Sequence, residues 1–69
     1  MMGEYVQRFG VIEQYDGVTG LVRGPTGCHK FYRAFVLGYE EKEAMRPGCK
    51  VFYYVSPYSK FAFYVTKLH

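Results

Sequence analysis

Glycines and prolines recur along the whole 69-residue chain and divide it into short runs rich in Val, Phe and Tyr. Runs of this composition between turn residues are typical of β-strands and leave little room for helices. The pattern predicts an all-β fold with five strands, at residues 5–15, 19–23, 30–36, 50–55 and 61–67.

The segments between these runs predict how the strands are connected. Asp16-Gly17 tolerates the positive φ angles of a tight hairpin, and Pro25 fixes φ in the next turn. Residues 56–60 suit a five-residue hairpin loop. The segment at 37–48 is too long for a tight turn, and Pro47-Gly48 limits it to at most one helical turn. We therefore expect a three-stranded meander, a crossing segment and a final hairpin.

This arrangement favours a small closed barrel, because closure removes the exposed edges of a flat five-stranded sheet. Two architectures fit: an OB-type Greek-key barrel and an SH3-like barrel. A chain of 69 residues is one domain, so the prediction covers residues 1–69.

Strict alternation along each strand predicts which side chains share a face. Val51, Tyr53 and Val55 have the pattern of core residues. Phe61, Phe63 and Val65 share one face of the last strand, and Gly10, Ile12 and Gln14 share one face of the first. Several strands carry apolar groups on both faces, which indicates an apolar outer patch or a packing partner.

The aromatic content indicates a contact surface. Eight Tyr and six Phe are too many rings for so small a core to bury, and exposed ring clusters usually mark binding surfaces. The net charge is +3, and three of the six acidic residues lie together at 40–43, so the remaining surface is more basic than the total. A basic surface favours a polyanionic partner.

Other function classes find little support in the chain. Cys28 and Cys49 lack metal-ligand spacing, and a disulfide between them stays open. No set of residues resembles a catalytic centre, so we expect no enzyme, no metal and no cofactor. No run is long and apolar enough to span a membrane, and residues 1–9 lack the apolar stretch of a signal peptide. We expect a cytoplasmic protein.

With the strands placed, the chain resembles the cold-shock domain, a small OB-type nucleic-acid binder. The family pattern G-x-V-x-W-F-N is similar to the segment from Gly10 to Asp16. Its strand G-F-G-F-I is similar to the segment from Val18 to Val22, and V-F-V-H-F to that from Phe31 to Phe35. Its ending A-x-x-V-T is similar to the segment from Ala62 to Thr66, so the resemblance covers nearly all of the chain.

The resemblance implies binding of single-stranded RNA or DNA by base stacking. The family's stacking positions fall on Gln14, Tyr15, Thr19, Leu21, Tyr32, Ala34 and Phe35, of which only Tyr15, Tyr32 and Phe35 carry rings. Tyr58 in the last loop is a further candidate ring. The candidates for phosphate contacts are Arg23, Lys30, Arg33 and Lys60. Because the family's ring set is incomplete here, a second interpretation is a protein-interaction module or homodimer that uses the same aromatic face.

Overall fold

The computed structural model describes residues 5–37 and 45–68, and over these residues it is an all-β domain. The strands are β1 (Val6–Tyr15), β2 (Thr19–Gly24), β3 (Gly27–Tyr32), β4 (Lys50–Val55) and β5 (Ala62–Lys67), with a single 3-10 turn, η1 (Arg33–Phe35), after β3. The expected helical turn near residues 40–45 lies largely outside the described residues.

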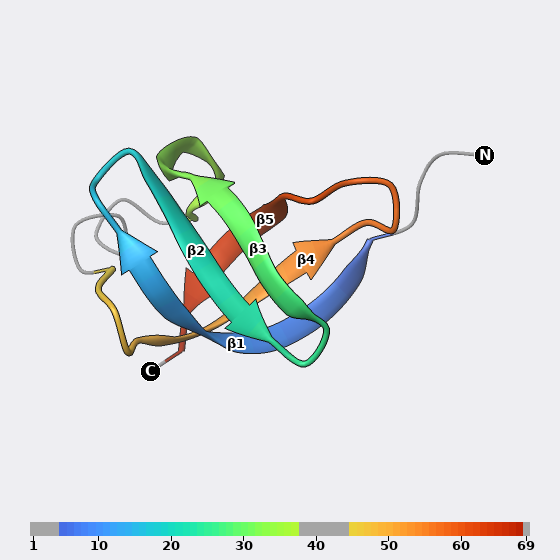
Figure 1. Ribbon diagram of the computed structural model, residues 1–69, viewed down its shortest axis with the longest axis horizontal. Coiled ribbons are helices and arrows are strands. Elements are labelled where there is room, and N and C mark those ends of the chain that lie inside the picture. Colours follow the sequence, from blue (N-terminus) through green and yellow to red (C-terminus); the bar gives the residue numbers. More distant parts are fainter. Residues whose placement is uncertain (1–4, 38–44, 69) are drawn as a thin grey trace.

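The five strands form one antiparallel sheet in the order β3-β2-β1-β4-β5. The sheet curls so strongly that β2 and β3 cross in front of β4 and β5, and the long β1 curves between the two layers (Figure 1). The outer strands then meet in parallel at two isolated bridges, Lys30 with Phe61 and Val36 with Val65. This strand order is the Greek-key arrangement of an OB-type barrel, the first of the two architectures expected from the sequence.

The third strand differs from its predicted span of 30–36. It begins three residues earlier because Gly24 pairs with Gly27 and leaves only Pro25 and Thr26 in the turn. It ends at Tyr32 because Tyr32 already pairs with Thr19, the first residue of β2, and no strand residue remains for the chain to pair with. The Arg33 amide donates to the Val18 carbonyl (2.9 Å), and the chain then turns through η1.

The core confirms the predicted inward face of β4, since Val51, Tyr53 and Val55 are all buried. The Tyr53 ring lies across the barrel against two glycines. A Cβ at Gly10 would stand 3.0 Å from its ring, and a Cβ at Gly24 would collide with its hydroxyl. The glycines therefore let the largest core side chain fit beneath β1 and β2.

Two irregularities overturn the predicted alternation in β1 and β5. In β1 the register shifts between Ile12 and Gln14, so Glu13 is an extra residue. Ile12 is buried while Gln14 is exposed, and these two do not share a face as predicted. A β-bulge of this kind re-aims the side chains that follow it.

The irregularity in β5 lies at Tyr64, which has a positive φ of 56°. Phe52 pairs with Thr66 and Tyr54 pairs with Phe63. Between these pairs the chain advances two positions in β4 and three in β5, so β5 contains one extra residue. Ala62 and Val65 are therefore the buried residues of this strand, and Phe63 no longer lies on the face of Val65. Without this bulge, strict alternation would have kept Phe63 and Val65 together.

The first hairpin uses its Asp-Gly pair in a different way from that predicted. Among the non-glycine residues that the structure describes, only Tyr64 has a positive φ, so in this turn Gly17 alone is left-handed, with φ of 92°. Asp16 contributes through its side chain, whose Oδ1 accepts from the amides of Val18 (2.9 Å) and Thr19 (2.8 Å). These two hydrogen bonds hold the pKa of Asp16 below its usual value of 3.8.

Candidate nucleic-acid interface

One row of side chains crosses the outer face of the barrel from β1 to the edge of β5. Gln14 pairs with Leu21, Leu21 pairs with Lys30, and Lys30 is bridged to Phe61. Thr19 and Tyr32 form the next row on the same face, because each lies two residues from Leu21 or Lys30 along its strand. We call the surface formed by both rows the outer face.

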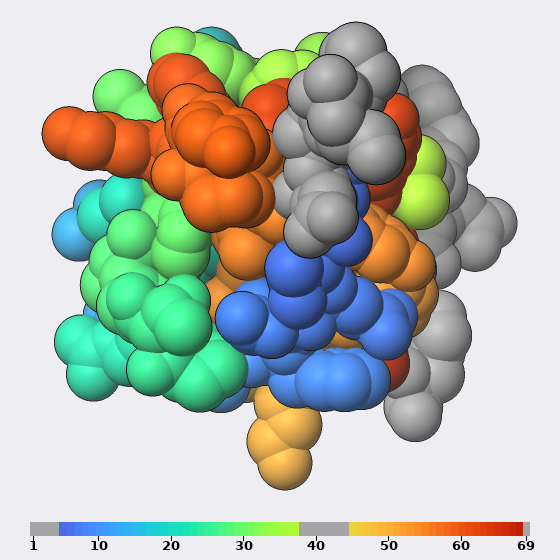
Figure 2. Space-filling view, turned by 90° about the vertical axis from the view of Figure 1, so that its right-hand side faces the viewer, coloured from blue at the N-terminus to red at the C-terminus, as the bar shows by residue number. Residues whose placement is uncertain are grey.

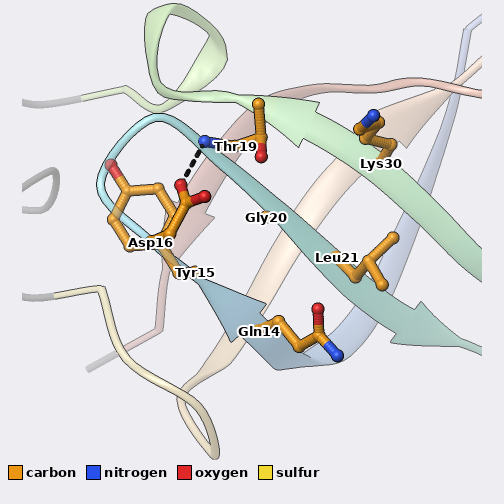
Figure 3. Close-up of a pocket in the computed structure, with 7 residues that line it drawn as sticks. All are labelled: Gln14, Tyr15, Asp16, Thr19, Gly20, Leu21 and Lys30. Atoms are coloured by element: carbon orange, nitrogen blue, oxygen red, sulfur yellow. Dashed lines mark hydrogen bonds between the residues drawn. The ribbon is translucent and has the colours of Figure 1, made fainter.

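A shallow pocket of about 480 Å³ opens over one part of the outer face. Figure 3 shows Gln14, Leu21 and Lys30 side by side on successive strands, with Thr19 and Asp16 near the turn. Tyr15 and Gly20 complete the lining. The pocket offers the Gln14 amide, the aliphatic Leu21 side chain and the Lys30 ammonium group, and the Asp16 carboxylate lies at the turn.

Gly20 beneath this pocket cannot be replaced by a larger residue without movement. A Cβ there would lie 2.4 Å from Phe31 Cζ and 2.6 Å from the carbonyl oxygen of Gln14. The bulge brings the Gln14 carbonyl over Gly20, and the Phe31 ring fills the space on the core side. The glycine in the family-like pattern thus has a packing role in this chain.

Five rings lie together along the edge where β3 and η1 meet β5, and we call Tyr5, Tyr32, Phe35, Phe61 and Phe63 the ring cluster. Tyr32 stacks on Phe61 with 5.3 Å between ring centroids and 28° between planes. Tyr32 also meets the edge of Phe35 at 5.8 Å, and Phe35 packs on Phe63 at 4.8 Å. Tyr5 contacts Phe63 edge-on at 5.7 Å. The ring cluster adjoins the outer face through Tyr32 and Phe61.

Three cationic residues are backbone neighbours of the stacked pair. Lys30 lies on the outer face two residues before Tyr32, and its backbone amide donates to the Lys60 carbonyl at 3.3 Å. Lys60 directly precedes Phe61 in the sequence, and Arg33 follows Tyr32. All three are exposed. Rings with cationic residues at neighbouring positions have the composition that suits single-stranded nucleic acids.

Five of the eight residues predicted from the sequence lie in neighbouring backbone segments: Lys30, Tyr32, Arg33, Phe35 and Lys60. Tyr15 is separate from the ring cluster, because its ring stacks on Phe31 (5.6 Å, 19°) at the margin of the core and contributes one side to the pocket. Arg23 forms an ion pair with Glu13 (Nε to Oε2, 2.6 Å). Tyr58 stands 86% exposed in the β4–β5 loop, with no ring contact among the described residues.

Sequence reasoning missed Phe61, Phe63 and Tyr5 as members of this surface. Strict alternation assigned Phe61 and Phe63 to the face of Val65, which is buried. The adjacent residues Lys60 and Phe61 could have indicated that Phe61 belongs to this surface, because they combine a ring and a charge as Lys30 and Tyr32 do. No signal in the sequence marks the bulge that turns Phe63 toward Phe35.

Several other features bear on the site. Cys28 and Cys49 are not joined by a disulfide. Within residues 5–37 and 45–68 there is no group of three or more His, Cys, Asp or Glu side chains that could hold a metal. The same residues include no long apolar helix of the kind that crosses a bilayer.

Comparisons with protein-family models, with curated proteins and with solved structures find no match to this chain.

Proposed function

We propose that this protein binds single-stranded RNA or DNA with low sequence preference, as a divergent barrel of the cold-shock kind. The observation that carries the proposal is the stacked pair of Tyr32 and Phe61, with exposed Lys30 and Lys60 at neighbouring backbone positions, at the end of a continuous outer face. Every nucleobase has an apolar π-face, so stacking on such rings tolerates any sequence.

Each part of the surface has a chemical role in this proposal. Tyr32 and Phe61 supply the ring surface on which a base lies. Lys30 and Lys60 meet the phosphates that flank that base, and exposed Arg33 adds a third cation beside Tyr32. The pocket over Leu21 receives the neighbouring nucleotide, where the Gln14 amide can both donate to and accept from a base edge.

The magnitudes predict weak to moderate affinity. Base stacking contributes about 1–3 kcal/mol per base, so two bases contribute roughly 2–6 kcal/mol. Micromolar affinity requires about 8 kcal/mol, and the phosphate contacts must supply the rest. Three contacts to single-stranded nucleic acid give a slope of about −2 for log K against log salt. We therefore expect a dissociation constant in the micromolar range or weaker at low salt.

The test is an NMR titration of the ¹⁵N-labelled protein with oligo-U and oligo-dT at low and high salt. We expect saturable shifts around Tyr32, Lys30 and Phe61 that weaken with salt. Tyr32→Ala and Phe61→Ala should each weaken binding about fivefold or more. Phe9→Ala is the matched control, because Phe9 is an exposed ring in the first half of β1 that contacts Phe52 and belongs neither to the outer face nor to the ring cluster. Equal effects of all three variants, or no shifts at millimolar oligonucleotide, would contradict the proposal.

A protein contact is the second candidate function, and the packing of the ring cluster favours it. Phe35, Phe63 and Tyr5 meet one another edge-on or tilted, so together they offer ring edges more than open ring faces. Such an apolar surface suits a second copy of the chain or another protein. Sedimentation at increasing protein concentration distinguishes the candidates. Self-association that Phe63→Ala abolishes, without oligonucleotide binding, would favour this second function.

A further inference from the structure

The end of the barrel away from the β1–β2 turn contains a second pocket, which the outer face does not use. It lies between the β2–β3 turn, the start of β1 and the β4–β5 loop, and has a volume of about 360 Å³. Figure 2 shows this end of the molecule, with a hollow between the green, blue and orange segments. We call it the end pocket. Its lining residues are Val6, Arg8, Thr26, His29, Val55, Ser56, Pro57 and Ser59.

The polar lining of the end pocket is rich in hydrogen-bond donors. Arg8 supplies a guanidinium group, and His29 an imidazole. No carboxylate lines the pocket among the described residues. The two described acids lie elsewhere: Glu13 pairs with Arg23, and Asp16 caps the β1–β2 turn.

Two side-chain nitrogens of this lining lack a partner among the described residues. Arg8 Nε is a buried donor, and His29 Nδ1 is a buried nitrogen that donates or accepts according to the tautomer. Among the residues that the structure describes, the guanidinium makes one long contact, from Nη1 to the Gln7 carbonyl oxygen (3.4 Å). A buried donor without an acceptor costs about 1–3 kcal/mol, and more when it carries charge. An acceptor in the end pocket would remove this cost if the Arg8 and His29 side chains turned these nitrogens toward it.

The serine hydroxyls of the lining can donate hydrogen bonds as well. Ser56 Oγ accepts from the Tyr58 amide (3.2 Å), and Ser59 Oγ accepts from the Phe61 amide (3.1 Å). Because each oxygen already accepts a hydrogen bond, its own O–H remains available to donate. The hydroxyl of Thr26, in the β2–β3 turn opposite, adds another donor.

The Tyr53 ring packs beside His29 of the end pocket. Its buried hydroxyl has no partner among the described residues, and its ring lies 6.1 Å from that of His29. Burial raises the pKa of Tyr53, and the Arg8 guanidinium partly opposes that rise. The guanidinium is therefore close enough to act on an oxygen within the barrel.

We propose that the end pocket binds a phosphate monoester. The phosphate oxygens would accept from Arg8, His29 and the serine hydroxyls, since arginine and hydroxyl groups are well suited to phosphate recognition. The volume exceeds that of a phosphate alone, and Val6, Val55 and Pro57 form an apolar wall for the organic part of the ligand. The ligand is either a small molecule, such as a nucleoside monophosphate, or the terminal phosphate of a nucleic-acid strand.

The test follows ¹H–¹⁵N shifts at constant ionic strength while uridine monophosphate, uridine or inorganic phosphate is added. We expect saturable shifts at Thr26, His29 and Ser59 with the monophosphate, weaker shifts with inorganic phosphate and none with uridine. Arg8→Gln should weaken binding about tenfold or more. Arg46→Gln is the matched control, because Arg46 is exposed and lies outside the end pocket.

Thr26→Val serves as a second variant if Arg8→Gln perturbs the fold, because Thr26 is exposed in a turn. Loss of the Thr26 hydroxyl should weaken binding of the monophosphate about threefold or more. A 5′-phosphorylated and a 5′-hydroxyl oligo-U then separate the two sources of phosphate. A gain in affinity from the 5′-phosphate that Arg8→Gln removes identifies a strand terminus, and equal affinities with retained monophosphate binding identify a small molecule.

The inference is overturned by either of two results. One is the absence of saturable shifts at the end pocket with 20 mM monophosphate, a concentration chosen as roughly ten times a millimolar dissociation constant. The other is the same dissociation constant in Arg8→Gln and Arg46→Gln. Oligo-U with hydroxyl ends tests the outer face separately, so either proposal can fail without the other.

Discussion

The left-handed conformation of Tyr64 leads to a prediction about two substitutions at one position. In an ordinary strand, alanine is more stabilising than glycine by about 0.5–1 kcal/mol, because glycine loses more conformational freedom on folding. At Tyr64 the φ of 56° reverses the comparison. A non-glycine residue there carries a penalty of about 1–2 kcal/mol, and glycine carries none.

The net result is that Tyr64→Gly should be more stable than Tyr64→Ala by about 0.5–1 kcal/mol, the difference between these two effects. Both variants lose the edge-on contact with the Tyr54 ring (6.0 Å), so that loss cancels in the comparison. The side chain is 53% exposed, which limits any difference in packing.

The matched control is the pair Gln7→Gly and Gln7→Ala. Gln7 is exposed in β1 and is the direct partner of Tyr54, so it lies in the same sheet without a positive φ. Here alanine should be the more stable by about 0.5–1 kcal/mol. The two pairs then differ by about 1–2 kcal/mol in opposite directions, which urea unfolding followed by circular dichroism resolves. Alanine equal to or more stable than glycine at position 64 would refute the bulge in β5.

Three further predictions concern stability. Gly20→Ala should lower the free energy of unfolding by about 2 kcal/mol or more, because the added Cβ meets Phe31 and the Gln14 carbonyl; an unchanged melting temperature would contradict the packing described. Asp16 has a lowered pKa, so its stabilisation is present above pH 3.8 and is lost as pH falls through the folded value. The free energy of unfolding of Asp16→Asn should therefore fall less than that of the parent as the pH is lowered. Equal falls in the two proteins would contradict the hydrogen bonds that Asp16 makes in the turn. Tyr53 has a raised pKa, so its contribution is complete below pH 10 and is lost as pH rises through the folded value. Tyr53→Phe should show a smaller alkaline loss of stability than the parent in melts from pH 8 to 11, and an equal loss would contradict burial of the hydroxyl.

The strands could be predicted from the sequence because their signals are local. Turn residues at Asp16-Gly17 and Ser56-Pro57 bound the runs of Val, Phe and Tyr, and β4 begins and ends at the predicted residues. The end of β3 could not be predicted, because it depends on where its partner β2 begins. Ala34 and Phe35 extend the apolar run of Phe31 and Tyr32, but they have no residue of β2 to pair with.

The candidate site was predicted as far as the strands alternate regularly. Lys30 and Tyr32 lie on one regular face of β3, and the structure exposes both. Tyr15 follows a bulge, so alternation gives no reliable side for its ring, which packs on Phe31. The bulge at Tyr64 has no glycine to mark it, although glycine is the usual residue at a positive φ. The side on which the Tyr15 ring lies and the place of the bulge at Tyr64 both depend on pairing between strands, and such pairing cannot be read from the local sequence.

Closure of the barrel depends on very little backbone. Among the described residues, the barrel is closed on the β3 and β5 side by two isolated bridges, Lys30–Phe61 and Val36–Val65, whereas neighbouring strands in the sheet share ladders of hydrogen bonds. This junction is the part of the described sheet where transient opening should be easiest, and amide hydrogen exchange should be fastest there among the strand residues. Tyr32 and Phe61 lie on the two sides of this junction. A molecule that binds both rings would therefore also hold the barrel closed and slow the hydrogen exchange there.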